Sequence, residues 1–170
     1  YILKKEFLKK CKRVAINFHP GTPDYRGIGC INFALLNNEK YYGCTAHIIN
    51  QKIDNGKILS VKRFKIRSND NVQSCLEKTY KLMFKQAKEI IKLLNKNEHN
   101  LMKLIEKNKK IKWSKILKTK KDLEKIYLIN KNISKKNLLR RITSPLDKKS
   151  STKFFKSFTL SFTFKLAHSL

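Results

Sequence analysis

The sequence predicts an α/β fold in which a sheet of three or four strands is covered by one long helix. Two runs of alternating apolar and polar residues, 41–50 and 58–66, are typical of strands. The Asn55-Gly56 pair between them is a strong hairpin signal, because this dipeptide readily adopts the backbone angles of tight turns. Over residues 70–94 the apolar positions recur at helical spacing, which predicts the covering helix.

Shorter elements are expected before the hairpin. Residues 1–12 place apolar side chains at helical spacing. Residues 14–16 form a short apolar run that is typical of a buried strand. Residues 28–36 predict a helix that begins after glycines. These elements, the hairpin and the long helix are expected to form one unit, residues 1–95.

The periodicity weakens beyond the long helix. Residues 101–121 fit either a helix or an extended arm, whereas 120–127 and 134–141 predict two short helices. Residues 158–164 are the candidate for a final β element. We therefore expect residues 96–170 to form a basic, mainly helical extension.

The positive charge of the chain is large and unevenly distributed. With 40 lysines and arginines against 12 acidic residues, the formal net charge is +28, and residues 61–170 hold 30 of the basic residues and 8 of the acidic ones. Such an excess is common in proteins that bind nucleic acids or anionic membranes. However, the sequence has no base-reading motif and no zinc-finger spacing. Because Lys, Asn and Ile dominate throughout, we interpret the charge as compositional drift and expect no specific nucleic acid and no membrane partner.

The cysteine pattern argues against disulfides and metals. The four cysteines include no C-x-x-C pair and no disulfide-dense cluster. Cys44 and His47 have a spacing that a metal ion can use, but two further ligands are not in sight, so no metal site is predicted. The sequence shows no signal peptide and no apolar run of transmembrane length. We therefore expect a cytoplasmic protein with reduced thiols.

Polar residues with complementary chemistry stand in turns beside the apolar segments. Asn17 and His19 follow the first apolar run, and Asp54 precedes the Asn-Gly pair. Acyl transfer to an amine needs such a set: an amide that donates to the developing oxyanion, an imidazole that takes the amine proton, and a carboxylate that orients the imidazole. Taken alone, each residue has an ordinary structural interpretation, such as turn formation by Asp54. Only their joint spacing favours catalysis.

Four blocks that follow one another in this order resemble the catalytic domain of the folate-dependent formyltransferases. The blocks are Asn17–Gly21, Tyr25–Gly27, Gly43–His47 and Asp54–Gly56. The resemblance implies that the fold is the C-terminal part of a Rossmann-like formyltransferase domain, with Asn17, His19 and Asp54 as catalytic residues. The run 27–35 is closer to the sugar N-formyltransferases than to the methionyl-tRNA branch.

The resemblance also implies the other site residues and the reaction. The residues expected to bind substrate are Pro20, Gly21, Tyr25 and Arg26. Those expected to bind the cofactor are Gly43, Thr45, His47 and Asp54. The implied reaction transfers the formyl group of N10-formyltetrahydrofolate directly to the primary amine of an amino sugar carried on a nucleotide diphosphate, without a covalent enzyme intermediate.

Two alternatives stay open beside a sugar N-formyltransferase. One is a methionyl-tRNA formyltransferase, in which the basic half would bind tRNA, although that branch normally adds a β-barrel domain and residues 80–170 look helical. The other is an inactive fragment that binds polyanions. In the family a further α/β segment precedes the strand with Asn17 and His19, so the chain resembles a domain without its N-terminal part. On that interpretation we expect the isolated chain to be poorly active and its sheet edge to be unpaired, which leaves a homodimer open.

Overall fold

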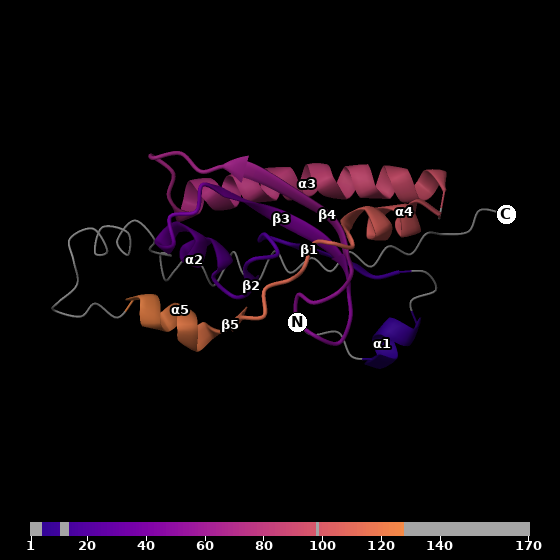
Figure 1. Cartoon of the computed structure of the whole chain (residues 1–170), viewed down its shortest axis with the longest axis horizontal. Coiled ribbons are helices and arrows are strands. Elements are labelled where there is room, and N and C mark those ends of the chain that lie inside the picture. The colour runs from indigo at the N-terminus through magenta and orange to yellow at the C-terminus, as the bar shows by residue number, and fades with distance from the viewer. Residues whose placement is uncertain (1–4, 11–13, 98, 128–170) are drawn as a thin grey trace.

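The computed structural model describes residues 5–10, 14–97 and 99–127. Its centre is an antiparallel sheet of three strands, in the order β1 (Ile16–His19), β3 (Tyr41–Ile48) and β4 (Ile58–Lys65). The helix α3 (Val72–Lys96) runs along the two long strands of this sheet (Figure 1). The expected α/β fold with a small sheet and a long covering helix is confirmed.

The central strand β3 has a hydrogen-bonded neighbour on each side. Asn17 of β1 lies opposite His47, and His19 lies opposite Thr45. On the other side β3 pairs with β4, with an irregularity in the register between Ala46 and His47. Within the described residues β1 is an edge strand of the sheet, because β3 is its only partner there.

The predicted hairpin is present, but its connection is longer than a two-residue turn. Residues 49–57 form a loop that is closed by a hydrogen bond from the Ile48 amide to the Lys57 carbonyl, at 2.9 Å. Asp54 adopts a left-handed φ of 42° in this loop. Gly56 is required by close approach, because a Cβ at this position would lie 1.6 Å from the Ile48 carbonyl oxygen. The loop therefore places Asp54 directly beside the end of β3.

The long helix α3 begins where the sequence provides an N-cap. The Asn71 side chain accepts from the Ser74 amide, and the Ser74 hydroxyl accepts from the Asn71 amide. Such capping typically contributes about 1 kcal/mol. The residues that α3 buries recur at helical spacing: Val72, Cys75, Thr79, Gln86 and Ile90. The helix therefore packs one face on the sheet, as the periodicity predicts.

Two hydrophobic clusters hold the elements together, and both include residues from beyond α3. The helices α2 (Cys30–Leu36) and α5 (Lys120–Tyr127) meet in the first cluster, where Leu123 and Ile126 of α5 are buried. The helix α4 (His99–Asn108) packs against the second cluster beneath β1, β3 and β4. The division of the chain at residue 95 stays a prediction, but residues 99–127 share their cores with the preceding residues.

Two short strands tie the later segment to the earlier one. The strand β2 (Arg26–Gly27) pairs in parallel with β5 (Leu117–Lys118), although the two are far apart in sequence. The remaining described helix, α1, spans Lys5–Lys10. The elements predicted at 134–141 and 158–164 lie outside the described residues. None of the described helices is long and apolar enough to cross a membrane.

Candidate active site

Adjacent strands and one loop bring the predicted catalytic residues together. Asn17 and His19 are alternate residues of β1, so their side chains share a face of the sheet. His47 lies opposite Asn17 on β3, and Asp54 follows in loop 49–57. The His19, His47 and Asp54 side chains are almost fully buried, at 4%, 3% and 8% exposure. The sheet register thus assembles the site at one end of β1 and β3.

The Asp54 carboxylate lies between two imidazoles. Its Oδ2 is 3.4 Å from His19 Nδ1, and its Oδ1 is 3.7 Å from His47 Nε2. The Gly27 amide donates to Oδ2 at 2.9 Å. Burial alone would raise the pKa of Asp54, but the neighbouring His47 and His19 imidazoles and the Gly27 amide lower it below its usual range. Asp54 is therefore ionised near neutral pH.

Backbone carbonyls define the tautomers of both histidines. His19 Nε2 lies 2.8 Å from the Tyr25 carbonyl oxygen, which can only accept, so Nε2 carries the proton. The lone pair of neutral His19 is then on Nδ1, the nitrogen that faces Asp54. Burial lowers the pKa of His19 more than the neighbouring Asp54 raises it. The resting pair is therefore an ionised carboxylate and a neutral imidazole.

His47 orients the Asn17 amide. Its Nδ1 lies 2.9 Å from the Ile48 carbonyl oxygen, so Nδ1 is the protonated nitrogen. The unprotonated Nε2 accepts from Asn17 Nδ2 at 3.1 Å. An amide nitrogen carries two hydrogens, so among the described residues one N–H of Asn17 remains for an oxygen atom of a bound molecule. This is the donor that an oxyanion needs.

Arg26 points its donors into the protein. Its Nε donates to the Asp54 carbonyl at 2.6 Å, and a second guanidinium nitrogen donates to the Ile53 carbonyl at 2.7 Å. The third donates to the Ser114 carbonyl at 2.9 Å. The substrate-binding role expected for Arg26 stays a prediction, whereas the geometry shows an anchor of the loop that carries Asp54.

The other predicted binding residues also have partners inside the protein. The Tyr25 hydroxyl donates to Glu39 at 2.8 Å, and the Thr45 hydroxyl donates to the Gly21 carbonyl at 2.7 Å. The Pro20 carbonyl accepts from the Tyr42 hydroxyl at 2.7 Å. Gly43 allows β4 to approach, because a Cβ there would lie 1.8 Å from the Lys62 carbonyl oxygen. Their contacts with substrate or cofactor stay predictions.

Trp113 is a site residue that sequence reasoning missed. Its ring stands edge-on to both imidazoles, with centroids 5.8 Å from His19 and 5.0 Å from His47. Its Nε1 donates to the Gly56 carbonyl at 2.7 Å. The available signal was that this is the single tryptophan of the chain, within a lysine-rich segment.

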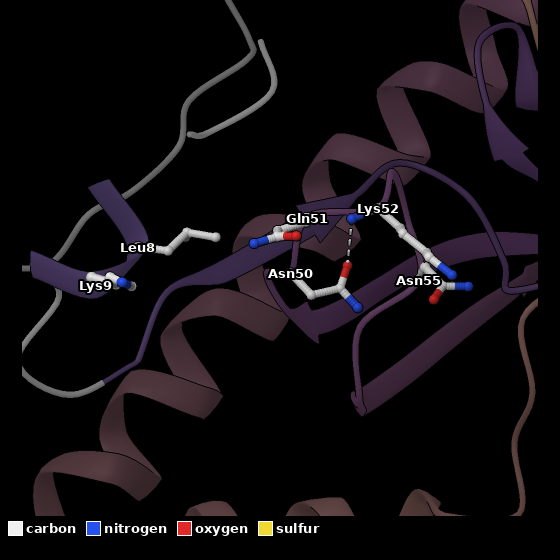
Figure 2. Close-up of a pocket in the computed structure, with 6 residues that line it drawn as sticks. All are labelled: Leu8, Lys9, Asn50, Gln51, Lys52 and Asn55. Atoms are coloured by element: carbon white, nitrogen blue, oxygen red, sulfur yellow. Dashed lines mark hydrogen bonds between the residues drawn. The ribbon is translucent and has the colours of Figure 1, made fainter. Parts of the chain in front are cut away.

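A cavity of about 510 Å³ that is widely open to solvent lies beside loop 49–57, on the side of α1. Figure 2 shows the side chains that line it: Leu8, Lys9, Asn50, Gln51, Lys52 and Asn55. Two ammonium groups and three amides suit a ligand that combines negative charge with hydrogen-bonding groups. In the described part of the chain, no three His, Cys, Asp or Glu side chains are placed to hold a metal ion.

Comparison with known proteins gives concordant results at the level of the family. Residues 1–91 match the family described as Formyl transferase. The methionyl-tRNA formyltransferase of Thermodesulfovibrio yellowstonii is 42% identical over 78 residues, which cover 45% of this chain and 25% of that protein. The chain thus spans about a quarter of the length of this relative.

Solved structures with the same fold include two kinds of formyltransferase. An N-formyltransferase from Helicobacter canadensis, in complex with folinic acid and dTDP-3-aminofucose, has a TM-score of 0.62 and 23% identity, over 84% of this chain and 51% of that one. The phosphoribosylglycinamide formyltransferase of Anaplasma phagocytophilum has a TM-score of 0.52 and 24% identity, over 55% of this chain and 46% of that one. Both support the Rossmann-like fold that the family resemblance implies.

Proposed function

This chain belongs to the formyl transferase family, and we propose that its site transfers a formyl group from N10-formyltetrahydrofolate to the primary amine of a nucleotide-linked amino sugar. The observation that carries the reaction is the convergence of Asn17, His19 and Asp54 at one end of β1 and β3. It combines an amide donor with a neutral imidazole and an ionised carboxylate in a largely buried setting.

Each member of the site has one task in this reaction. When the amine attacks the formyl carbon, the free N–H of Asn17 donates to the oxygen that becomes negative, which is worth about 2.7–4 kcal/mol at comparable sites. His19 takes the amine proton at Nδ1, where Asp54 Oδ2 lies 3.4 Å away and stabilises the imidazolium. His47 keeps the Asn17 amide turned toward the reaction. The new C–N bond thus forms first, and the bond from the formyl carbon to N10 then breaks as the oxyanion collapses. The proton held by His19 passes to N10, which releases tetrahydrofolate and restores the neutral imidazole.

The lining of the cavity beside loop 49–57 supports it as a place for part of the formyl donor, although Gly43, Thr45, His47 and Asp54 do not line it. A folate carries carboxylates at one end and a hydrogen-bonding ring system at the other, and the cavity offers Lys9 and Lys52 together with amide side chains. The loop that lines the cavity (Figure 2) also carries Asp54, the neighbour of Asn55 in sequence. The folinic acid complex of the Helicobacter canadensis protein supports this class of donor.

The extent of the structural likeness favours an amino sugar as acceptor. The alignment with the Helicobacter canadensis protein covers 84% of this chain. Residues 1–96 are a smaller part of the chain than that, so the structural likeness extends beyond the end of α3. The phosphoribosylglycinamide enzyme covers only 55%. A methionyl-tRNA acceptor is the second candidate, because the sequence relative with 42% identity carries that name. A cytoplasmic location and a homodimer stay predictions.

The two acceptors can be distinguished with the purified 170-residue chain. The chain is incubated with N10-formyltetrahydrofolate and either dTDP-3-aminofucose or methionyl-tRNA, and products are identified by mass spectrometry. We expect the formylated amino sugar to form slowly, in line with the low activity expected of this chain, and the tRNA to stay unmodified. Formylation of the tRNA alone would overturn the sugar assignment, and the absence of product from both would count against enzymatic activity of this chain. Donor binding is measured separately through Trp113 fluorescence during titration with folinic acid.

We expect kcat to stay high as the pH is lowered past the ordinary pKa of histidine, and to fall only at the lower pH at which His19 becomes protonated. The reason is that burial lowers the pKa of His19, and neutral Nδ1 is the required base. The groups that act on this imidazole are Asp54, His47 and Arg26. The pH dependence of kcat at saturating substrate measures this limb. If kcat instead fell with an apparent pKa at or above about 6.5, the ordinary pKa of histidine, the assignment of His19 as the base would be contradicted.

A further inference from the structure

We propose that Trp113 is a positioning residue of this site, which fixes both imidazoles and the Asp54 loop relative to one another. The proposal rests on the proposed function, because positioning affects turnover only where the site performs the transfer. Trp113 lies outside residues 1–91, the part of the chain that matches the family. The structure therefore assigns a role in the site to a later segment of the chain.

The indole contacts the two histidines through the edge-on geometry that aromatic rings prefer. The interplanar angles are 69° with His19 and 84° with His47. Asp54 lies between the same two imidazoles. Movement of the indole would therefore change the position of both histidines with respect to the carboxylate.

The indole also holds the loop. Its Nε1–H donates to the carbonyl of Gly56, two residues after Asp54. Because His47 precedes the loop and Gly56 is near its end, one side chain contacts both ends of the segment that carries the carboxylate. The Trp113 contacts thus link both strands of the site to the Asp54 loop.

The segment around Trp113 is anchored strongly enough to act as a support. The Ser114 amide donates to the Pro23 carbonyl at 2.8 Å, and its carbonyl accepts from Arg26 at 2.9 Å. Before Trp113 in the sequence, the Asn108 side chain donates to the Leu59 carbonyl of β4 at 2.8 Å. After it, β5 pairs with β2. Residues 108–118 therefore cross the site between fixed points, and the indole is positioned by its backbone.

Trp113 is half-buried, whereas the histidines beside it are 4% and 3% exposed. The indole thus covers the imidazoles and excludes water from them. Burial has the largest effect on the pKa of His19 and lowers it, whereas the charge of Asp54 raises it. Removing the cover should therefore raise the pKa of His19.

The test compares Trp113→Phe and Trp113→Ala with the unaltered chain. Phenylalanine keeps a ring against the imidazoles but removes the hydrogen bond to Gly56, whereas alanine removes both. Phe84→Ala is the matched control, because this aromatic residue is 63% exposed on α3. Imidazole NMR titrations give the pKa of His19 directly, and steady-state kinetics separate kcat from KM. Thermal unfolding shows whether each variant is folded.

In Trp113→Ala we expect the pKa of His19 to rise and kcat to fall by about 10², as for a displacement of about 1 Å in an active site, with a smaller change in KM. Trp113→Phe should keep the His19 titration near that of the unaltered chain and recover most of kcat, and Phe84→Ala should change neither. An unchanged His19 titration in folded Trp113→Ala would overturn the proposal. If alanine prevents folding, an unchanged titration and an unchanged kcat in Trp113→Leu would overturn it. If the unaltered chain shows no transfer, the proposed function fails, while the titration still tests the positioning.

Discussion

Replacing His19 with alanine is expected to lower kcat for formyl transfer by at least about 10², with a much smaller change in KM. The imidazole is the group that takes the amine proton, and Asp54 lies 3.4 Å from the nitrogen that receives it. Rates at saturating amino sugar and donor measure the effect.

Two further variants make this result specific. Asp54→Asn preserves the size of the side chain but removes the charge that stabilises the imidazolium, so a similar loss of kcat is expected. His99→Ala is the matched control, because it removes an exposed histidine of α4. A near-normal kcat in folded His19→Ala would show that the proton is accepted elsewhere and that the catalytic assignment is wrong.

Elements set by local sequence were predictable. The helix at 120–127 is confirmed with the predicted limits. The predictions for α2 and α3 are close, because apolar periodicity and the glycines before α2 act over a few residues. The alternative left open for 101–121 resolves into α4 followed by a short strand, β5. The pairing of β5 with β2 joins residues about ninety positions apart, and no local signal specifies such a contact.

The same distinction applies to the site. The spacing of Asn17, His19 and Asp54 was visible in the sequence, and the register of β1 and β3 explains why they meet. The orienting role of His47 depends on the Ile48 carbonyl, a backbone group that a motif does not show. Trp113 enters the site because α4 and β5 fix the ends of its segment. The sequence shows that Arg26 carries a positive charge, but only the fold shows that its guanidinium donates to the carbonyls of Ile53, Asp54 and Ser114.

Arg26→Lys is expected to lower both the free energy of unfolding and kcat. The guanidinium satisfies the carbonyls of Ile53, Asp54 and Ser114 from a position that is 9% exposed. A lysine ammonium lacks the planar fork that reaches three separated acceptors. Only the bond to the Asp54 carbonyl is fully buried, whereas those to Ile53 and Ser114 are part-buried. A buried group left without a partner costs about 1–3 kcal/mol, so a loss of this size is expected. Urea unfolding measures it, and an unchanged m value shows that the denatured state is unaffected.

This variant also separates the two roles considered for Arg26. If the guanidinium binds substrate, KM should rise while the free energy of unfolding stays close to that of the unaltered chain. If it anchors the loop, stability and kcat should fall together, because Asp54 with its left-handed φ of 42° loses the contact that holds its backbone. Arg63→Lys is the control, since this arginine is 44% exposed and lies 3.8 Å from Asp24. Its unfolding free energy should change by less than about 1 kcal/mol, as is usual for a surface ion pair.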